Sequence, residues 1–331
     1  MEFLEREVDH LLFSSIAPSS SRTYSAGFRC YTDFCIAMSI RPFPATETQL
    51  LWFVASVRRR LGYKSIKVYL CAIQFESTLA GFPLEMSRFT RLHYALRGVR
   101  RLQGNKFTRQ PREPITVHHL FKLLDYFETN FSHPDDFMLT SAVLLAFFSL
   151  LRSSEYTSKS TKRCDSINTL NFDDIHFERN FNFVQVQISG SKTDPFRVGC
   201  ALKAWSVKGR LCPVRALKKF ILNHPFRTGP LFSYADGTFL TRNRLSRVIK
   251  LAIPNTNLDT HSFRIGGASA AAAAGIPDST IQVMGRWSSN AYRTYLRMPD
   301  QMFKSAARLM NYARTITPRW SPEEVNCISW V

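Results

Sequence analysis

Apolar residues recur at steps of three and four along most of the chain, and no other feature constrains the fold as strongly. This spacing lines one side of an α-helix. One region departs from it, because residues 173–177 and 181–188 alternate apolar and polar across Arg179-Asn180, which predicts a β-hairpin. Residues 196–198 are expected to add a third strand. The sequence therefore predicts a mainly α protein with one small antiparallel β-sheet.

The first hundred residues form one block of predicted helices. Four segments of helical periodicity lie between residues 19 and 102, and breaks that contain Pro or Gly separate them. This pattern predicts a helical bundle over residues 1–102. The segment 103–114, QGNKFTRQPREP, is polar, basic and Pro-bearing, so we expect it to link the bundle to a second domain, 115–331, which holds the sheet.

The chain is strongly basic. Its 331 residues include 44 Lys and Arg against 25 Asp and Glu, a formal charge of +19. An excess of this size indicates a polyanionic partner, in preference to a basic surface that only keeps the protein soluble. The arginines that we expect to contact phosphates lie on two predicted helices: Arg88, Arg91, Arg97, Arg100, Arg101, Arg242 and Arg244.

Several other classes of protein are disfavoured by composition. The seven cysteines are odd in number, scattered and without a CxxC pair, which predicts reduced thiols in an intracellular protein and no metal site. No apolar run approaches the ~18 residues of a membrane span, and the acidic N-terminus differs from a signal peptide. A glycine loop that would cradle a nucleotide is also missing, so we predict no cofactor.

Three short motifs carry residues suited to phosphate chemistry. A very apolar helix, expected over 138–151, leads into LLRSSE, which places Arg152 at its end and Glu155 one turn on. Lys192 lies in a Gly-Ser-Lys-Thr turn after the hairpin. His261 and Arg264, in HSFR, are three residues apart and share one side of a helix if this is its first turn. Each of these residues alone would be unremarkable.

The motif HSFR opens a region of short predicted helices. An alanine-rich helix ends at Gly275 and Pro277, a second covers 278–284, and a third carries Tyr292 and Tyr295 after Gly285-Arg286-Trp287. The turns between them bring a guanidinium, an imidazole and a phenol back toward one place. This combination suits chemistry on a phosphodiester.

In this order (Arg152, Lys192, His261-x-x-Arg264, then a tyrosine), the motifs resemble those of the tyrosine recombinase, or phage-integrase, family over residues 116–297. The Ala run and GRWSSNAYRTYLR are similar to recombinases of eukaryotic mobile elements, DIRS-like or crypton-like. The resemblance implies a SAM-like, helical core-binding domain and a catalytic domain of the DNA breaking-rejoining fold. It also implies a homotetramer on two DNA sites and, for a eukaryotic source, a nuclear location.

The resemblance further implies a reaction. Tyr295 would attack a DNA phosphodiester, form a 3′-phosphotyrosyl intermediate and release a 5′-hydroxyl, without metal or ATP. Arg152 and Arg264 would neutralise the non-bridging oxygens. Lys192 would protonate the leaving oxygen, and His261 would bind the phosphate or accept the tyrosine proton. Glu155 would orient Arg152.

One position departs from the family pattern. A second His, or sometimes Trp, is expected nine residues before the tyrosine, where this chain has Arg286; Trp287 comes one place later. Either Arg286 contacts the phosphate or Trp287 takes the place. The nucleophile also has an alternate in Tyr292, although spacing and the trailing Leu-Arg favour Tyr295.

A function without catalysis is the main alternative. Residues 262–287 also read as a helix-turn-helix, with small residues in the first helix and Gly in the turn. A domesticated recombinase that binds DNA and no longer cuts it would share this pattern. The complete set of Arg152, Lys192, His261, Arg264 and a tyrosine favours the enzyme, because decay would be expected to remove some of them.

Overall fold

The chain divides into two compact units, Met1–Gln110 and Pro111–Val331. The structure, a computed structural model, describes residues 2–107, 110–162, 168–190, 194 and 196–297. Among these residues no helix combines the length and apolar character needed to cross a membrane. The turn lysine, Lys192, lies outside the described residues.

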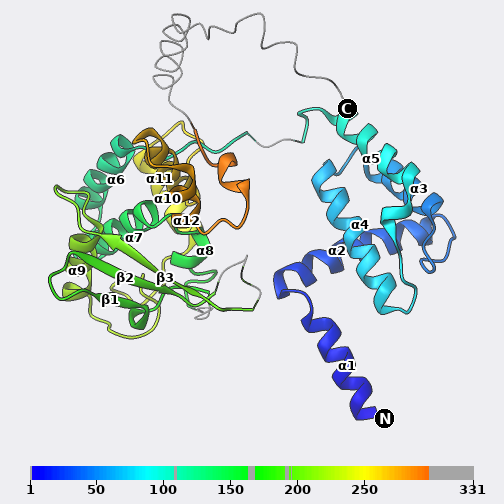
Figure 1. Ribbon diagram of the computed structural model, residues 1–331, viewed down its shortest axis with the longest axis horizontal. Helices are drawn as coiled ribbons and strands as arrows, with labels where there is room; N and C mark the ends of the chain where they lie inside the picture. Colours follow the sequence, from blue (N-terminus) through cyan, green and yellow to red (C-terminus); the bar gives the residue numbers. More distant parts are fainter. Residues whose placement is uncertain (1, 108–109, 163–167, 191–193, 195, 298–331) are drawn as a thin grey trace, which may run out of the picture. The chain divides into compact units, whose positions relative to one another are not determined.

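All the regular elements described in unit 1 are helices (Figure 1). Its core is formed by apolar side chains from the last four of its α-helices and the loops between them, among them Tyr31, Phe53 and Ile73. Its helices are α1 (Glu2–Ser14), α2 (Pro18–Ala37), α3 (Glu47–Val57), α4 (Tyr63–Leu79), the 3₁₀ turn η1 (Met86–Arg88) and α5 (Thr90–Gln103).

Unit 2 combines helices with the one described β-sheet (Figure 1). Its elements are α6 (Val117–Asn130), α7 (Asp135–Phe148), α8 (Ser153–Tyr156), η2 (Phe172–Asp174), β1 (Ile175–Phe177), β2 (Phe183–Ile188), β3 (Cys200–Trp205), α9 (Pro213–Asn223), α10 (Arg242–Ala252), α11 (Ser262–Ala273), α12 (Asp278–Met284) and η3 (Asn290–Thr294). The mainly α architecture with a small antiparallel sheet that the sequence predicted is confirmed.

The helix starts follow from local chemistry. Thr46 and Gln49 form a reciprocal capping box at α3, and Thr116 caps α6 by accepting a hydrogen bond from the backbone of His119. Helix α7 is apolar on all sides, and most of its residues are fully buried. It packs between α6, α9 and α11, so unit 2 is built around it.

The sheet has the order β1-β2-β3 with both pairs antiparallel, and Val186 of β2 lies between Ile175 and Leu202. Alternate residues of β2 point into the core shared with α7 and α9, which anchors the sheet on the helices. The predicted hairpin is confirmed.

The predicted third strand at 196–198 is wrong, because the strand begins at Cys200. The Asp194 carboxylate accepts the backbone N–H groups of Val198 and Gly199, which closes a turn. Arg197 and Gly199 have φ values of 56° and 70°, so the chain there cannot be extended. Phe196 is 89% exposed and therefore contributes nothing to the core.

The predicted linker, residues 103–114, is divided between the two units. Gln103 is the last residue of α5, and its side chain bonds to the carbonyls of Arg58 and Leu61. Farther on, Ile115 donates to the carbonyl of Ser262, and Asn257 donates to that of Pro111, both within unit 2. The roles of the two units as core-binding and catalytic domains stay predictions.

Helix α11 approaches its neighbours so closely that glycine is required. A Cβ at Gly266 would lie 1.9 Å from the carbonyl oxygen of Ile115, which is backbone and cannot rotate away. We expect Gly266→Ala to destabilise unit 2 by about 3 kcal/mol and to lower its unfolding midpoint by roughly 6–12 °C in calorimetry. Gly98→Ala in α5, where a Cβ meets no atom within 4 Å, should instead stabilise unit 1 by about 0.5–1 kcal/mol. Equal effects of the two substitutions would contradict this account.

Candidate active site

The site begins where the most buried helix ends. Helix α7 stops at Phe148, and Leu150 follows with a φ of 48°. The prediction that Arg152 lies at the end of the apolar helix is therefore wrong, because Arg152 is the N-cap of the short helix α8. The reversal after α7 leaves the carbonyl of Leu150 pointing at two guanidinium groups, those of Arg264 and Arg286.

Glu155 joins two of the candidate residues. Its Oε2 accepts the backbone N–H of Arg152 at 2.8 Å, and its Oε1 accepts the Arg152 guanidinium at 3.2 Å. Arg286 also donates to both oxygens, to Oε1 at 3.1 Å and to Oε2 at 2.9 Å. All three side chains are largely buried, with 2% exposure at Glu155, so these are charge-assisted bonds in a dry setting.

Arg264 is fully buried and completes this group. Its guanidinium donates to the carbonyls of Leu150 and Gly285 and lies 4.1 Å from the centre of the Trp287 ring, a cation–π contact. Burial, followed by the charges of Arg152 and Arg286, lowers the pKa of Arg264 to about 9. Arg264 is therefore a cation at neutral pH.

These four residues, Arg152, Glu155, Arg264 and Arg286, form what we call the arginine cluster. Three guanidinium groups share one carboxylate, so the cluster carries a formal charge of +2. The Nε atoms of Arg264 and Arg286 are buried and have no hydrogen-bond partner among the residues that the structure describes. A buried excess of positive charge beside spare donors is typical of a site for an anion.

His261 lies at the N-cap position of α11 and is fixed through Asp259. The Asp259 carboxylate accepts the backbone N–H of His261 at 2.8 Å and pairs with Arg112 at 2.7 Å and Arg242 at 3.2 Å. Burial, with the nearby charges of Arg112 and Arg264, lowers the pKa of His261 to about 4. Its imidazole is therefore neutral at pH 7.

Tyr295 lies among the residues expected to accompany it. Its ring centre is 5.3 Å from that of His261, 5.1 Å from that of Trp287 and 5.6 Å from the Arg264 guanidinium carbon. The Ser269 hydroxyl donates to its carbonyl at 3.3 Å, which ties it to α11. The structure thus brings Arg152, His261, Arg264, Arg286, Trp287 and Tyr295 together.

Tyr292 occupies a different environment. It is 3% exposed, and its hydroxyl donates to Asp278 Oδ2 at 2.8 Å while it accepts from Arg293. A phenol held in this way is a structural anchor between η3 and α12. The expected third helix is only the five-residue 3₁₀ segment η3, and Tyr295 follows its last residue.

The predicted DNA-contacting arginines divide into two groups. Those at residues 88–101 are exposed, although Arg88 pairs with Glu85 at 2.5 Å. In α10, Arg242 pairs with Asp259, and Arg244 lies 3.3 Å from the centre of the Tyr234 ring and donates to Thr238. The two α10 side chains are therefore engaged inside unit 2, and DNA contact by either set stays a prediction.

Sequence reasoning missed Asp259 and Arg112. Arg112 falls in the expected linker and Asp259 in a loop, so neither belongs to a periodic pattern or a short motif. The two side chains meet only because residues 111–115 run beside the loop that leads to α11. No local signal in the sequence marks this pairing.

Comparisons with known proteins agree with this fold. No protein-family model matches the chain. The protein called "Integrase/recombinase xerD homolog" of Selenomonas ruminantium is 22% identical over 303 residues, 87% of this chain and 84% of that protein. The site-specific recombinase XerH bound to a palindromic difH substrate has a TM-score of 0.60 at 16% identity, covering 88% of this chain and 79% of that one. A lambda integrase tetramer bound to a Holliday junction has a TM-score of 0.56 at 14% identity, covering 89% and 76%.

The chain shares its fold with these DNA recombinases, and the arginine cluster lies in unit 2 of that fold. The resemblance to tyrosine recombinases and integrases that the sequence predicted is supported by this fold and by the likeness in sequence. The likeness to eukaryotic mobile elements, and with it a nuclear location, stays a prediction.

The arginine cluster should depend on its one carboxylate. Glu155→Gln leaves three buried guanidinium groups without a counter-charge, so we expect a loss of roughly 3–5 kcal/mol in the free energy of unfolding by urea. The control is Glu85→Gln, which breaks an exposed pair with Arg88 and should cost no more than about 0.5 kcal/mol. A cost at Glu155 as small as that at Glu85 would show that the cluster is not held by charge.

Proposed function

We propose that this protein breaks and rejoins DNA strands through a covalent 3′-phosphotyrosyl intermediate, with Tyr295 as the nucleophile. The observation that supports this most directly is the position of Tyr295 beside His261 and Arg264, next to a buried cluster with a charge of +2. The substrate would be double-stranded DNA. Lambda integrase, which has a similar fold, is a dimer on a core site and a tetramer on a Holliday junction, which favours a tetramer on two sites here.

The chemistry requires neutralisation of a phosphate that gains charge in the transition state. Tyr295 Oη would form a bond to phosphorus while the bond to the 5′-oxygen breaks, so the phosphodiester bond energy is kept in the enzyme–DNA bond. Arg152, Arg264 and Arg286 would face the non-bridging oxygens, since guanidinium groups bind two oxygens at once. Loss of one such donor typically costs ~100-fold or more in rate.

The lowered pKa of His261 favours one of its two expected roles. With a pKa of about 4, its imidazole holds a proton weakly and is a poor base near neutrality. A neutral ring still donates one N–H, so we assign His261 a hydrogen bond to the phosphate. Lys192 is left as the acid that protonates the leaving 5′-oxygen, on the strength of its place in the sequence.

The position at which this chain departs from the family pattern, nine residues before Tyr295, can also be given a role. Arg286 is held by Glu155, while Trp287 covers the Arg264 guanidinium and packs against Tyr295. These contacts favour a division of labour, in which Arg286 adds charge and Trp287 orients Arg264 and the nucleophile. Neither residue would then replace the other.

The helix-turn-helix alternative receives less support. Helix α11 is almost entirely buried, and a Cβ at either Gly266 or Gly267 would meet backbone carbonyl oxygens. Helix α12, which would read the DNA bases, has no Lys or Arg, and its Asp278 is bonded to Tyr292. Both features suit packing within the domain more than contact with DNA.

The nucleophile can be tested with a nicked duplex taken from the DNA that flanks the coding sequence. The wild-type protein should be trapped as an adduct that resists denaturation, because the nicked strand fragment diffuses away. Tyr295→Phe should abolish the adduct and keep DNA affinity within about twofold, since only one hydroxyl is lost. Tyr292→Phe, the matched control, should still form it. Adducts with Tyr295→Phe, and none with Tyr292→Phe, would reverse our assignment, whereas wild-type binding without any adduct would support the non-catalytic alternative.

Stability should depend on pH through His261. Because folding lowers its pKa from 6.5 to about 4, the unfolded chain binds more protons at this residue across that window. The contribution of His261 to folding is therefore complete above pH 6.5 and is lost as the pH falls toward 4. Urea unfolding of wild type and His261→Gln across this range should show a difference that shrinks with acidity. A difference that is constant with pH would contradict a lowered pKa.

A further inference from the structure

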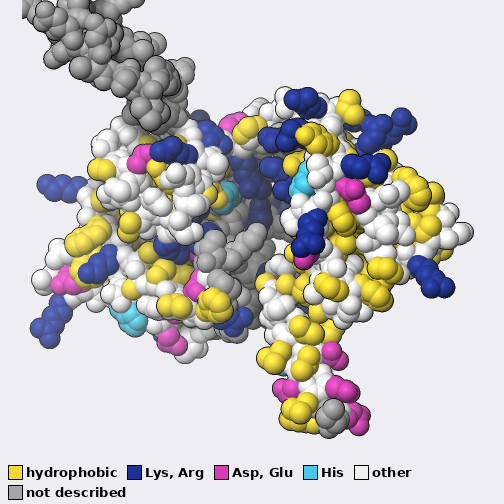
Figure 2. All heavy atoms as spheres, turned by 45° about the vertical axis from the view of Figure 1, so that its right-hand side comes forward, with side chains coloured by type: hydrophobic (Ala, Val, Ile, Leu, Met, Phe, Trp, Pro, Cys, Tyr) yellow, Lys and Arg dark blue, Asp and Glu magenta, His cyan; other side chains and the backbone are white. Residues whose placement is uncertain are grey.

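Helix α1 contributes no residue to the hydrophobic cores of the described part of the chain. None of its residues is buried, although Phe3, Leu4, Val8, Leu11, Leu12 and Phe13 are between 42% and 72% exposed. Leu4, Val8 and Leu11 follow helical spacing and share one side. An isolated helix of 13 residues is marginal in water, and so large an apolar side marks a surface that packs on something else. Figure 2 shows the apolar and acidic side chains along this helix at the lower right.

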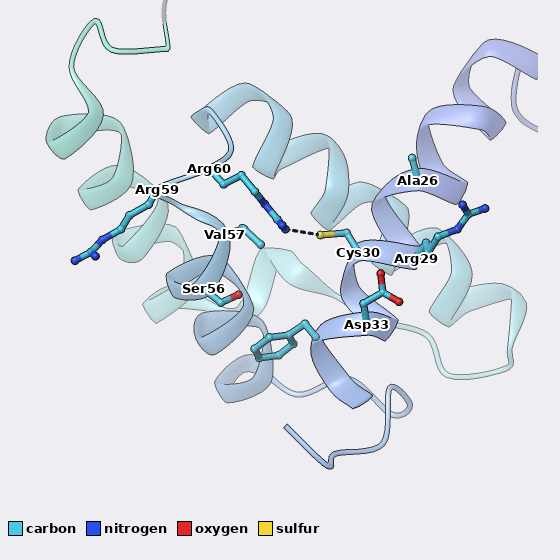
Figure 3. A pocket seen from close by; sticks show the side chains of 9 residues that line it. Ala26, Arg29, Cys30, Asp33, Ser56, Val57, Arg59 and Arg60 are labelled. Carbon is cyan, nitrogen blue, oxygen red and sulfur yellow. Dashed lines mark hydrogen bonds between the residues drawn. The ribbon is translucent and has the colours of Figure 1, made fainter. Parts of the chain in front are cut away.

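A groove of matching character lies in the same unit. It has a volume of about 650 Å³ and is formed by α2 and the end of α3. Phe34 and Val57 supply apolar lining, and Arg29, Arg59 and Arg60 supply positive charge. Figure 3 shows Arg60 reaching toward Cys30, with the Arg29 and Arg59 side chains pointing outward on either side. Arg60 donates to the sulfur of Cys30 at 3.5 Å across the groove, so the turn that follows α3 reaches α2 there.

The charges of the helix and the groove are complementary. Helix α1 carries Glu2, Glu5, Glu7 and Asp9 against one cation, Arg6, a formal charge of −3 in a chain whose total is +19. The groove carries three arginines against one carboxylate, Asp33, a charge of +2. Complementary charge favours the encounter of two surfaces and fixes their register.

We propose that α1 of one copy of this chain packs into the groove between α2 and α3 of a second copy. Its apolar side would cover Phe34 and Val57, and its acidic residues would face Arg29, Arg59 and Arg60. Each copy offers one helix and one groove, so exchange of the helix uses both surfaces without any other partner. The contact requires neither DNA nor the proposed reaction.

Cys30 provides a direct test, because it lines the groove. Two full-length proteins of different size are mixed without DNA and exposed to a short thiol cross-linker. One carries Val8→Cys together with Cys30→Ser, and the other keeps its natural α1 and Cys30. A heterodimer on a denaturing gel is expected. Arg6→Cys in place of Val8→Cys, on the opposite side of α1, should give at least tenfold less product, and Cys30→Ser in the second protein should abolish it.

Two outcomes of the cross-linking overturn the proposal. Without a heterodimer at any protein concentration, α1 does not reach the groove of another copy. If a single chain with Val8→Cys and Cys30 instead gives only a compact, cross-linked monomer, the helix folds back on its own groove.

Charge-reversal variants distinguish a second copy of the protein from DNA as the occupant of the groove. The helix variant combines Glu5→Lys, Glu7→Lys and Asp9→Lys, and the groove variant combines Arg29→Glu, Arg59→Glu and Arg60→Glu. Each should weaken self-association at least tenfold in sedimentation, and the variant that carries both sets should restore it. Restoration also excludes misfolding as the cause. If the groove variant loses DNA affinity and self-association is unchanged, the groove binds the nucleic acid and the proposal is wrong.

Discussion

The site depends on three largely buried arginines and on the one carboxylate, Glu155, that pairs with two of them. The guanidinium groups repel one another, and each loses hydration when it is removed from water. The fold must therefore supply hydrogen-bond acceptors for them. Glu155 supplies two oxygens, and the carbonyls of Leu150 and Gly285 supply the rest. Both carbonyls lie just beyond helix ends. The ends of α7 and α12 are therefore part of the charge balance and not only connections.

The parts of the fold that could be predicted are those set by neighbouring residues. Thr46 and Thr116 announce the helices that they cap, and the alternation of residues 183–188 defines a strand. The third strand was misplaced because Phe196 and Val198 alternate as a strand would. Asp194 overrides this preference by binding the backbone of the following residues. A side chain that bonds to backbone a few residues away competes with strand formation, and composition does not reveal which will win.

The candidate site also has a part that the sequence predicted and a part that it did not. The order of the motifs pointed to Arg152, His261, Arg264 and Tyr295 before any geometry was known. The place of Arg286 was left open, since its φ of 57° turns its side chain toward Glu155, and a non-glycine residue seldom adopts such a value. Asp259 lies outside every motif, yet it holds His261 while pairing with two arginines from distant segments. Long-range pairs of this kind depend on the completed fold.

The two tyrosines act as one unit, despite their different environments. Residues three apart in a 3₁₀ segment lie on the same side, and the backbone N–H of Tyr295 donates to the carbonyl of Tyr292 at 2.8 Å. Because the Tyr292 hydroxyl is fixed on Asp278, the next turn can present Tyr295 to His261 and Trp287. Ser269 of α11 holds the other end, since it donates to the carbonyl of Tyr295 and accepts the N–H of Arg297. Helix α11 thus carries Arg264 in its first turn and holds Tyr295, the proposed nucleophile, from its last two turns. A single helix therefore links the cationic part of the site to this tyrosine.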